Sequence, residues 1–228
     1  MKTTKLTTHN IMFTQTMVWD GQNSDLNLGL ILGKKRNYII DTGLGSDSVA
    51  PILEHISHDT KPIVVVNTHS CFDHIWGNWV FESSLIISHI LCRDSIREDW
   101  DHVIQAYSEH INGEARRCLP NLVFEKNLYF PEDGIEIFHT PGHTPGCISV
   151  YDTVDKVLYA GDNIGDTDDE IVPAIWTDLA TFQRLIKTYK EYDFNFCISG
   201  HNKPQTKEVL SRMEDALPEV WGKQNNRE

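Results

Sequence analysis

The chain has no long run of hydrophobic residues. Its most apolar segments, such as residues 63–66, are far too short to cross a lipid bilayer. The pattern of a signal peptide is missing as well, because residues 1–10 are polar and residues 11–19 are interrupted by Thr and Gln. We therefore expect a cytoplasmic protein that neither spans a membrane nor binds one.

Basic residues are also scarce. The chain has 20 Lys and Arg against 33 Asp and Glu, which gives a formal net charge of −13 at pH 7. Such a charge repels the phosphates of nucleic acids unless Lys and Arg gather in a local patch, and the sequence contains no such cluster. These features predict a small-molecule substrate rather than a nucleic-acid partner, and they leave the oligomeric state open.

Cysteine occurs only five times, at irregular spacing. An odd number of cysteines in a cytoplasmic chain argues against a framework of disulfides and favours free thiols or metal ligands. We expect Cys92, Cys118 and Cys197 to be small buried residues and Cys147 to lie in the core of a strand. A Gly-x-Ser-x-Gly motif is absent too, so the sequence offers no serine nucleophile of that type.

The 228 residues, 40% of them hydrophobic, fit a single domain over 1–228. Patterns of apolar residues predict a hairpin of 27–32 and 37–41, helices 46–56, 76–82, 94–111, 179–189 and 207–217, and strands 62–67, 84–88, 128–130, 135–140, 146–152, 156–160 and 194–199. Ser95 and Glu98 form the pattern of a capping box for the helix 94–111, and Asp178 that of a cap for 179–189. Strands interleaved with helices predict an α/β sandwich with its helices outside.

A dense group of metal-binding side chains follows the buried strand 62–67. Within six residues the chain carries four competent ligands, His69, Cys71, Asp73 and His74. In an extended backbone, the alternation of residues 69, 71 and 73 would place those side chains on one side. A bound divalent cation would offset the cost of gathering so many polar groups at the edge of a core.

Three further candidates stand at strand ends with glycine beside them. His143 lies in the segment 140–146, Asp162 follows the strand 156–160, and His201 follows the strand 194–199. Glycine allows the backbone to approach closely where a side chain would obstruct. By contrast, we expect His139 to have a structural role, and the acidic segment 166–170 to be a solvated loop.

The chain resembles the metallo-β-lactamase superfamily over essentially its whole length, on these motifs and on Asp41 in the segment 40–43. The resemblance implies a four-layer αβ/βα sandwich with two Zn²⁺ ions, or iron or manganese instead. It implies one metal held by His69, Cys71 and His143, a second held by Asp73, His74 and His201, Asp162 bridging the two, and Asp41 supporting the ligand loop from behind.

Cys71 departs from the family pattern, which has His at that position of the His-x-His-x-Asp-His motif. Thiolate is a good zinc ligand, so a set of one thiolate and two imidazoles is chemically sound. The added negative charge would reduce the Lewis acidity of that metal. In the alternative, Cys71 points away and only the second position binds metal well.

The resemblance implies hydrolysis of an ester-type bond by hydroxide formed from metal-bound water, with Asp73 as the catalytic residue that orients the nucleophile. A thioester or lactone is favoured, as in the glyoxalase II and lactonase-like branches, although no helical domain for glutathione follows His201. Two alternatives stay open. One is an iron oxygenase similar to persulfide dioxygenases, with a triad of His69, His143 and Asp162; the other is a catalytically weak metal-binding or sensing protein.

Overall fold

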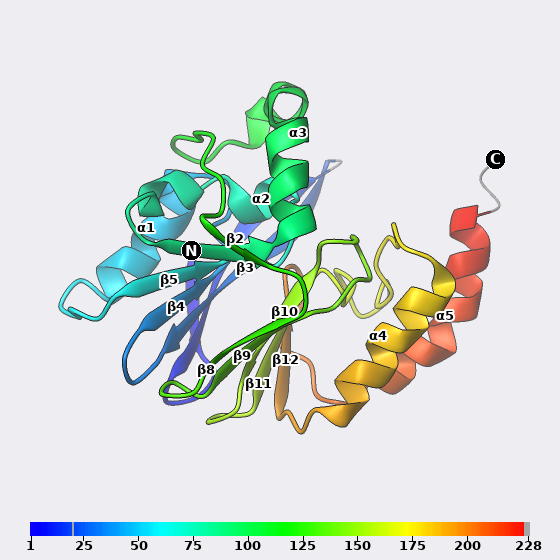
Figure 1. Cartoon of the computed structure of the whole chain (residues 1–228). Coiled ribbons are helices and arrows are strands. Elements are labelled where there is room, and N and C mark those ends of the chain that lie inside the picture. Colours follow the sequence, from blue (N-terminus) through cyan, green and yellow to red (C-terminus); the bar gives the residue numbers. More distant parts are fainter. Residues whose placement is uncertain (20, 226–228) are drawn as a thin grey trace.

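Two β-sheets stacked face to face form the centre of the computed structural model, which describes residues 1–19 and 21–225 (Figure 1). The first sheet contains, in spatial order, β1 (Lys2–Lys5), β2 (Asn10–Trp19), β3 (Gln22–Leu32), β4 (Asn37–Ile40), β5 (Ile63–Val66), β6 (Leu85–His89) and β7 (Leu122–Phe124). The second contains, in the order β12-β11-β10-β9-β8, the strands β8 (Asn127–Phe130), β9 (Ile135–His139), β10 (Ile148–Asp152), β11 (Val157–Gly161) and β12 (Phe196–Ser199).

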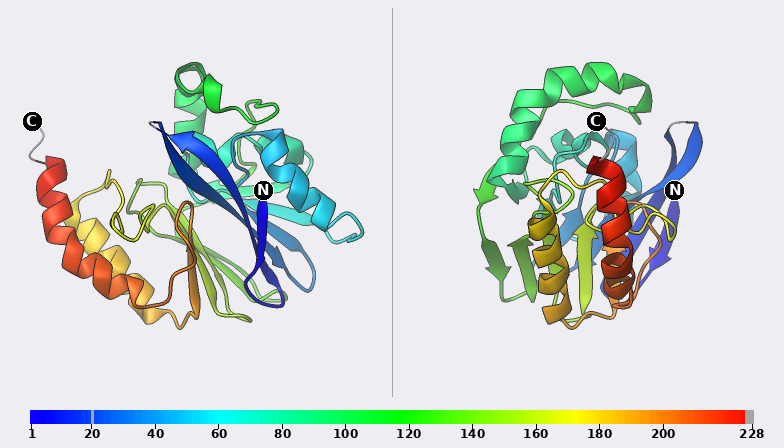
Figure 2. Two further views of the ribbon diagram at one scale, coloured as in Figure 1. Left: turned by 180° about the vertical axis from the view of Figure 1, so that it is seen from behind. Right: turned by 90° about the vertical axis from the view of Figure 1, so that its right-hand side faces the viewer.

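Helices cover the outer sides of both sheets (Figures 1 and 2). α1 (Ser46–His55) covers the first sheet, whereas α2 (Phe72–Ile75) and α3 (Ile90–Ala106) lie at the upper ends of the strands in Figure 1. 3₁₀ turns are formed by Asn78–Phe81 and Ser108–His110. The second sheet carries α4 (Leu179–Glu191) and α5 (Val209–Asn225). The order helix, sheet, sheet, helix is the predicted αβ/βα sandwich, which is confirmed.

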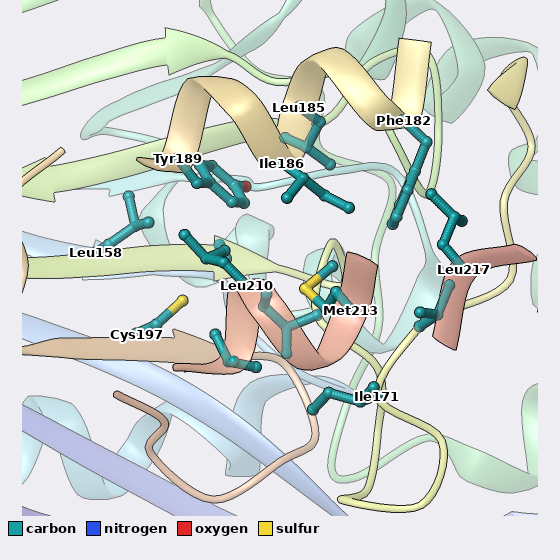
Figure 3. Packing of buried hydrophobic residues seen from close by; sticks show 14 of the residues in the cluster. Leu158, Ile171, Phe182, Leu185, Ile186, Tyr189, Cys197, Leu210, Met213 and Leu217 are labelled. Carbon is teal, nitrogen blue, oxygen red and sulfur yellow. The ribbon is translucent and has the colours of Figure 1, made fainter. Parts of the chain in front are cut away.

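The period of two along each strand explains these layers. In β11, Val157 and Tyr159 face the core between the two sheets, whereas Leu158 and Ala160 face α4 and α5. Figure 3 shows Leu158 near Tyr189 of α4, in the buried cluster that also contains Phe182 and Met213. Both faces of β11 are buried, which explains why its sequence is apolar throughout, as is typical of a central strand.

The helix predicted over 94–111 has different limits. α3 begins at Ile90, directly after β6, because the Nδ1 of His89 accepts the amide hydrogen of Leu91 and caps the helix. Ser95 lies inside the helix and bonds Asp99, so the predicted capping box is wrong. Helical geometry ends at Ala106.

Other predicted elements also differ from the structure in their limits. The helix predicted over 76–82 is wrong: residues 72–75 form α2, and only Asn78–Phe81 form a 3₁₀ turn. The last helix runs from Val209 to Asn225 rather than over 207–217. β1 and β2 were not predicted, since their polar residues hide the alternation. β7 was not predicted either, because its three apolar residues are too few to show a period.

All five cysteines are free thiols, as predicted. Cys92, Cys147 and Cys197 are buried, whereas Cys118 is only half-buried, so its predicted burial is wrong. Cys147 lies directly before β10 rather than in a strand, so its predicted place is also wrong. No helix in the described part of the chain combines the length and the apolar character needed to cross a membrane.

Candidate metal centre

Strand ends from both sheets meet at one edge of the sandwich. In the first sheet β4 and β5 run parallel, so Asp41 and His69, which follow them, leave the sheet at the same edge. In the second sheet β11 and β12 are parallel and are followed by Asp162 and His201. His143 enters from the turn between β9 and β10. Residues distant in the sequence are thereby brought together.

The segment 69–74 contributes four of the predicted ligands. Cys71 is the last extended residue, and α2 starts at Phe72. The predicted alternation therefore fails at Asp73, which lies in a helical turn rather than in extended backbone. Asp73 still reaches the same place, with its Oδ2 3.6 Å from the Nε2 of His74 and 3.2 Å from the Nε2 of His201.

All seven predicted metal ligands converge in three overlapping groups of ligand-type atoms. Within each group these atoms lie within 4.8 Å of one another, and the groups are His69 with Cys71 and His143, His69 with His74 and Asp162, and Asp73 with His74 and His201. The Sγ of Cys71 is 3.6 Å from the Nε2 of His143, so the thiol points toward the centre. Asp162 occupies the middle, with an oxygen 3.3 Å from the Nε2 of His74 and another 3.4 Å from that of His201.

Three atoms of this centre are buried without a hydrogen-bond partner. They are the Nε2 of His69, the Nε2 of His74 and the Oδ1 of Asp162. An unpaired buried polar atom costs free energy, and folded proteins contain few of them. A divalent cation would satisfy all three, because imidazole nitrogen and carboxylate oxygen are its ordinary ligands. The residues present therefore fit a metal site.

The opposite ring nitrogens are held in place. Three imidazoles donate through Nδ1 to fixed acceptors at 2.8 Å, which are a carboxylate oxygen of Asp41 for His74, the carbonyl of Ala174 for His143 and the carbonyl of Asp25 for His201. This bond fixes the tautomer, so that Nε2 is free to bind a cation, and it fixes the orientation of each ring.

Asp41 connects the start and the end of the ligand segment that follows β5, through Thr68 and His74. One of its carboxylate oxygens accepts the amide hydrogen of Thr68 at 2.7 Å, and the other accepts the hydroxyl of Thr68 at 2.7 Å and the Nδ1–H of His74. The hydroxyl of Thr68 in turn accepts from the Nδ1 of His69 at 3.1 Å. Asp41 has a φ of 62°, a conformation that is uncommon for any residue except glycine.

The charges of the centre reinforce one another. Burial disfavours the charged form of His74, but the carboxylates of Asp162, Asp73 and Asp41 outweigh it and hold its pKa well above the ordinary value. The same balance between burial and carboxylates raises the pKa of His201. Burial also disfavours ionised Asp73, but the neighbouring His74 and His201 lower its pKa to about 2. Asp73 thus stays ionised at neutral pH.

The pKa shifts of Cys71 and His143 favour the neutral form of each side chain. Burial, followed by the charges of Asp73 and Asp162, raises the pKa of the Cys71 thiol well above its usual range. Burial and the neighbouring His69 lower the pKa of His143, which favours the neutral imidazole that a metal requires. Of these two, only Cys71 would have to lose a proton in order to bind a cation.

Several residues that hold or contact the candidate ligands were not predicted from the sequence. The side chain of Asn163 accepts the amide hydrogen of His143 at 2.9 Å and donates to the carbonyl of Thr140 at 2.9 Å. Its position next to Asp162 was the one available signal. The ring of Trp176 lies 4.9 Å from that of His143. The carbonyls that hold the histidines gave no signal, because every residue has one.

Two regions outside the centre agree with their predictions. His139 stacks on His89 with ring centroids 3.9 Å apart and donates to the carbonyl of Pro145, which is a structural role. The acidic residues of the segment 166–170 are exposed, and Asp168 forms ion pairs with Lys203 and Arg212.

Several known proteins resemble the chain in sequence. The acyl-coenzyme A thioesterase MBLAC2 of Bos taurus is 27% identical over 164 residues, which cover 61% of this chain and 58% of that protein. An N-acyl homoserine lactonase of a Bacillus species is 28% identical over 104 residues, or 44% of this chain and 37% of the lactonase. The chain thus spans little more than half the length of the thioesterase and less of the lactonase.

Solved structures share the fold. A metallo-beta-lactamase of Erythrobacter litoralis superposes with a TM-score of 0.78 at 15% identity, covering 95% of this chain and 96% of that one. One of Pontibacter korlensis gives 0.75 at 19% identity, covering 95% and 98%. Residues 25–220, most of the chain, match the family description of the metallo-beta-lactamase superfamily. The protein therefore belongs to the metallo-beta-lactamase superfamily.

Proposed function

We propose that the protein is a metal-dependent hydrolase that holds two zinc ions and cleaves an ester-type bond, with a thioester or a lactone as substrate. The observation that carries this proposal is the set of buried, unpaired atoms of His69, His74 and Asp162 beside a cavity of about 490 Å³. The relatives that are named as a thioesterase and a lactonase add support for the type of bond.

The ligands divide between two ions. His69, Cys71 and His143 would hold one zinc and Asp73, His74 and His201 the other, with Asp162 between them. The carboxylate of Asp162 suits this place because its two oxygens lie 3.3 Å from the Nε2 of His74 and 3.4 Å from that of His69. Bound zinc lowers the pKa of water toward neutrality and polarises a carbonyl oxygen.

The chain's own residues position the reaction. Hydrolysis joins the oxygen of water to the acyl carbon, breaks the bond from that carbon to sulfur or oxygen, and passes a proton to the leaving group. Asp73 remains ionised, since its pKa is about 2, and it lines the cavity. It is therefore placed to accept a hydrogen bond from the water and to orient it.

Metal content and substrate class test the proposal together. We expect elemental analysis of the purified protein to find zinc, and the zinc-loaded protein to hydrolyse members of a panel of thioesters, lactones and phosphodiesters from the first two classes. Iron together with oxygen consumption would overturn it in favour of the oxygenase.

Cobalt provides a test of the Cys71 ligand that does not depend on activity. Co²⁺ replaces Zn²⁺ in most sites of this kind, and a bound thiolate gives an intense near-ultraviolet charge-transfer band. We expect this band in the cobalt-loaded protein and its loss in Cys71→Ala. Because the pKa of the Cys71 thiol is raised, metal binding should also release its proton, so apparent affinity should fall as the pH is lowered.

Cys118→Ala is the matched control, because this half-buried thiol lies outside the three ligand groups. It should keep the band and release as many protons as the unmodified protein. Calorimetry of metal binding in buffers of different ionisation enthalpy measures the release, which should fall by about one proton in Cys71→Ala. A band that survives Cys71→Ala would mean that the thiol does not bind the metal.

A further inference from the structure

The cavity beside the candidate metal centre has a largely apolar wall. Trp76 and Phe72 line it, and α3 supplies Ile96, Trp100 and Val103. Its volume of about 490 Å³ lies within the range of cavities that bind small molecules. The apolar wall and the ligand residues belong to one continuous space, since Asp73, Asp162 and His143 line the same cavity.

Apart from its histidines, the ionised side chains that line this cavity are all carboxylates. Among the described residues no lysine or arginine contributes to its lining. Besides Asp73 and Asp162, which belong to the ligand groups, the carboxylates of Asp99 and Asp166 face it. A second carboxylate or a phosphate placed in the cavity, away from the metal ligands, would lose water and gain no cationic partner. Buried unpaired charge and like charges at close range are both costly.

We propose that this cavity receives the acyl part of the substrate and selects apolar, uncharged acyl groups over acyl groups with a distal carboxylate. The proposal rests on the proposed function for the identity of the reacting bond. It adds the substrate class: a neutral aliphatic or aromatic acyl ester, thioester or lactone. A leaving group that carries phosphates would have to lie outside the cavity.

Two thioesters that differ by one charge test this selection. The hexanoyl and the hexanedioyl thioesters of N-acetylcysteamine have the same chain length and the same neutral leaving group, but the second ends in a carboxylate. We expect the zinc-loaded protein to favour the hexanoyl thioester by at least about 20-fold in kcat/KM. Equal values for the two compounds would overturn the proposal.

Variants of the cavity wall test whether its residues determine the preference for the hexanoyl thioester. Val103→Lys places a cation in the wall and should reduce the preference at least about fivefold. Gln105→Lys is the control, since it adds the same charge on an exposed part of α3 that does not line the cavity, and it should leave the preference unchanged. Asp99→Asn removes a carboxylate without adding bulk and should also reduce the preference. If neither Val103→Lys nor Asp99→Asn changes it, the cavity is not the acyl site.

Binding separates this proposal from the proposed function. Four tryptophans line the cavity, Trp19, Trp76, Trp100 and Trp176, so tryptophan fluorescence reports its occupation. The matched pair of non-hydrolysable thioethers, one with and one without the terminal carboxylate, should bind with the same preference as the thioesters. Preference in binding without hydrolysis of either thioester would support the acyl site and overturn the hydrolase. Hydrolysis of both at equal rates would support the hydrolase and overturn the selection.

Discussion

Asp73→Ala and His143→Ala will each abolish hydrolysis and reduce the metal content of the purified protein. Each candidate ligand lies in a different group, Asp73 with His74 and His201, and His143 with His69 and Cys71. Removal of one ligand from a set of three leaves a cation poorly held. We expect kcat/KM to fall at least about 1,000-fold, since both the metal and the residue that orients water are affected by Asp73→Ala.

Exposed residues of the same types provide the controls. His58→Ala and Asp101→Ala change side chains on the surface and should leave both metal content and kcat/KM unchanged. Metal content is measured by elemental analysis, and thermal unfolding verifies that each variant folds. Full metal occupancy or full activity in either Asp73→Ala or His143→Ala would contradict the assignment of these ligands.

The convergence of these residues could be predicted from the sequence because strand ends leave a clear local pattern. Each of Asp41, Asp162 and His201 follows an apolar strand at once or after one glycine, and parallel neighbours end at the same edge. Helix boundaries away from these strand ends were harder to predict. The start of α3 was misplaced because His89, a strand residue, caps it through its ring nitrogen, and such a cap has no sequence signature.

The groups that orient the candidate ligands could not be predicted from the sequence. The acceptors that orient His143 and His201 are backbone carbonyls of Ala174 and Asp25, which any residue would supply. The cavity wall was only partly foreseeable. The apolar stripe of α3 was visible in the sequence, but the strand β2, which brings Trp19 to the same cavity, was not predicted. Tertiary packing alone joins these segments.

Gly200→Ala should disrupt the metal centre from outside the set of ligands. A Cβ added to Gly200 would lie 2.1 Å from the Oδ1 of Asp162 and 2.6 Å from the Cε1 of His74. The backbone has little freedom to retreat, because the carbonyl of Gly200 accepts the amide hydrogen of Asn27 at 2.6 Å. Asp162 and His74 must therefore move. We expect zinc affinity to fall by about 100-fold, with a parallel loss of hydrolysis.

Gly222→Ala makes the same chemical change where nothing obstructs it. A Cβ at Gly222 meets no atom within 4 Å, and the residue lies in α5. Alanine suits a helix better than glycine, so this variant should keep its zinc affinity and gain about 0.5–1 kcal/mol of stability. Competition with a chromophoric chelator measures the affinity, and thermal unfolding measures the stability. If Gly200→Ala bound zinc as tightly as Gly222→Ala, this result would contradict the assignment of Asp162 and His74 as zinc ligands. Their buried, unpaired atoms would then require another explanation.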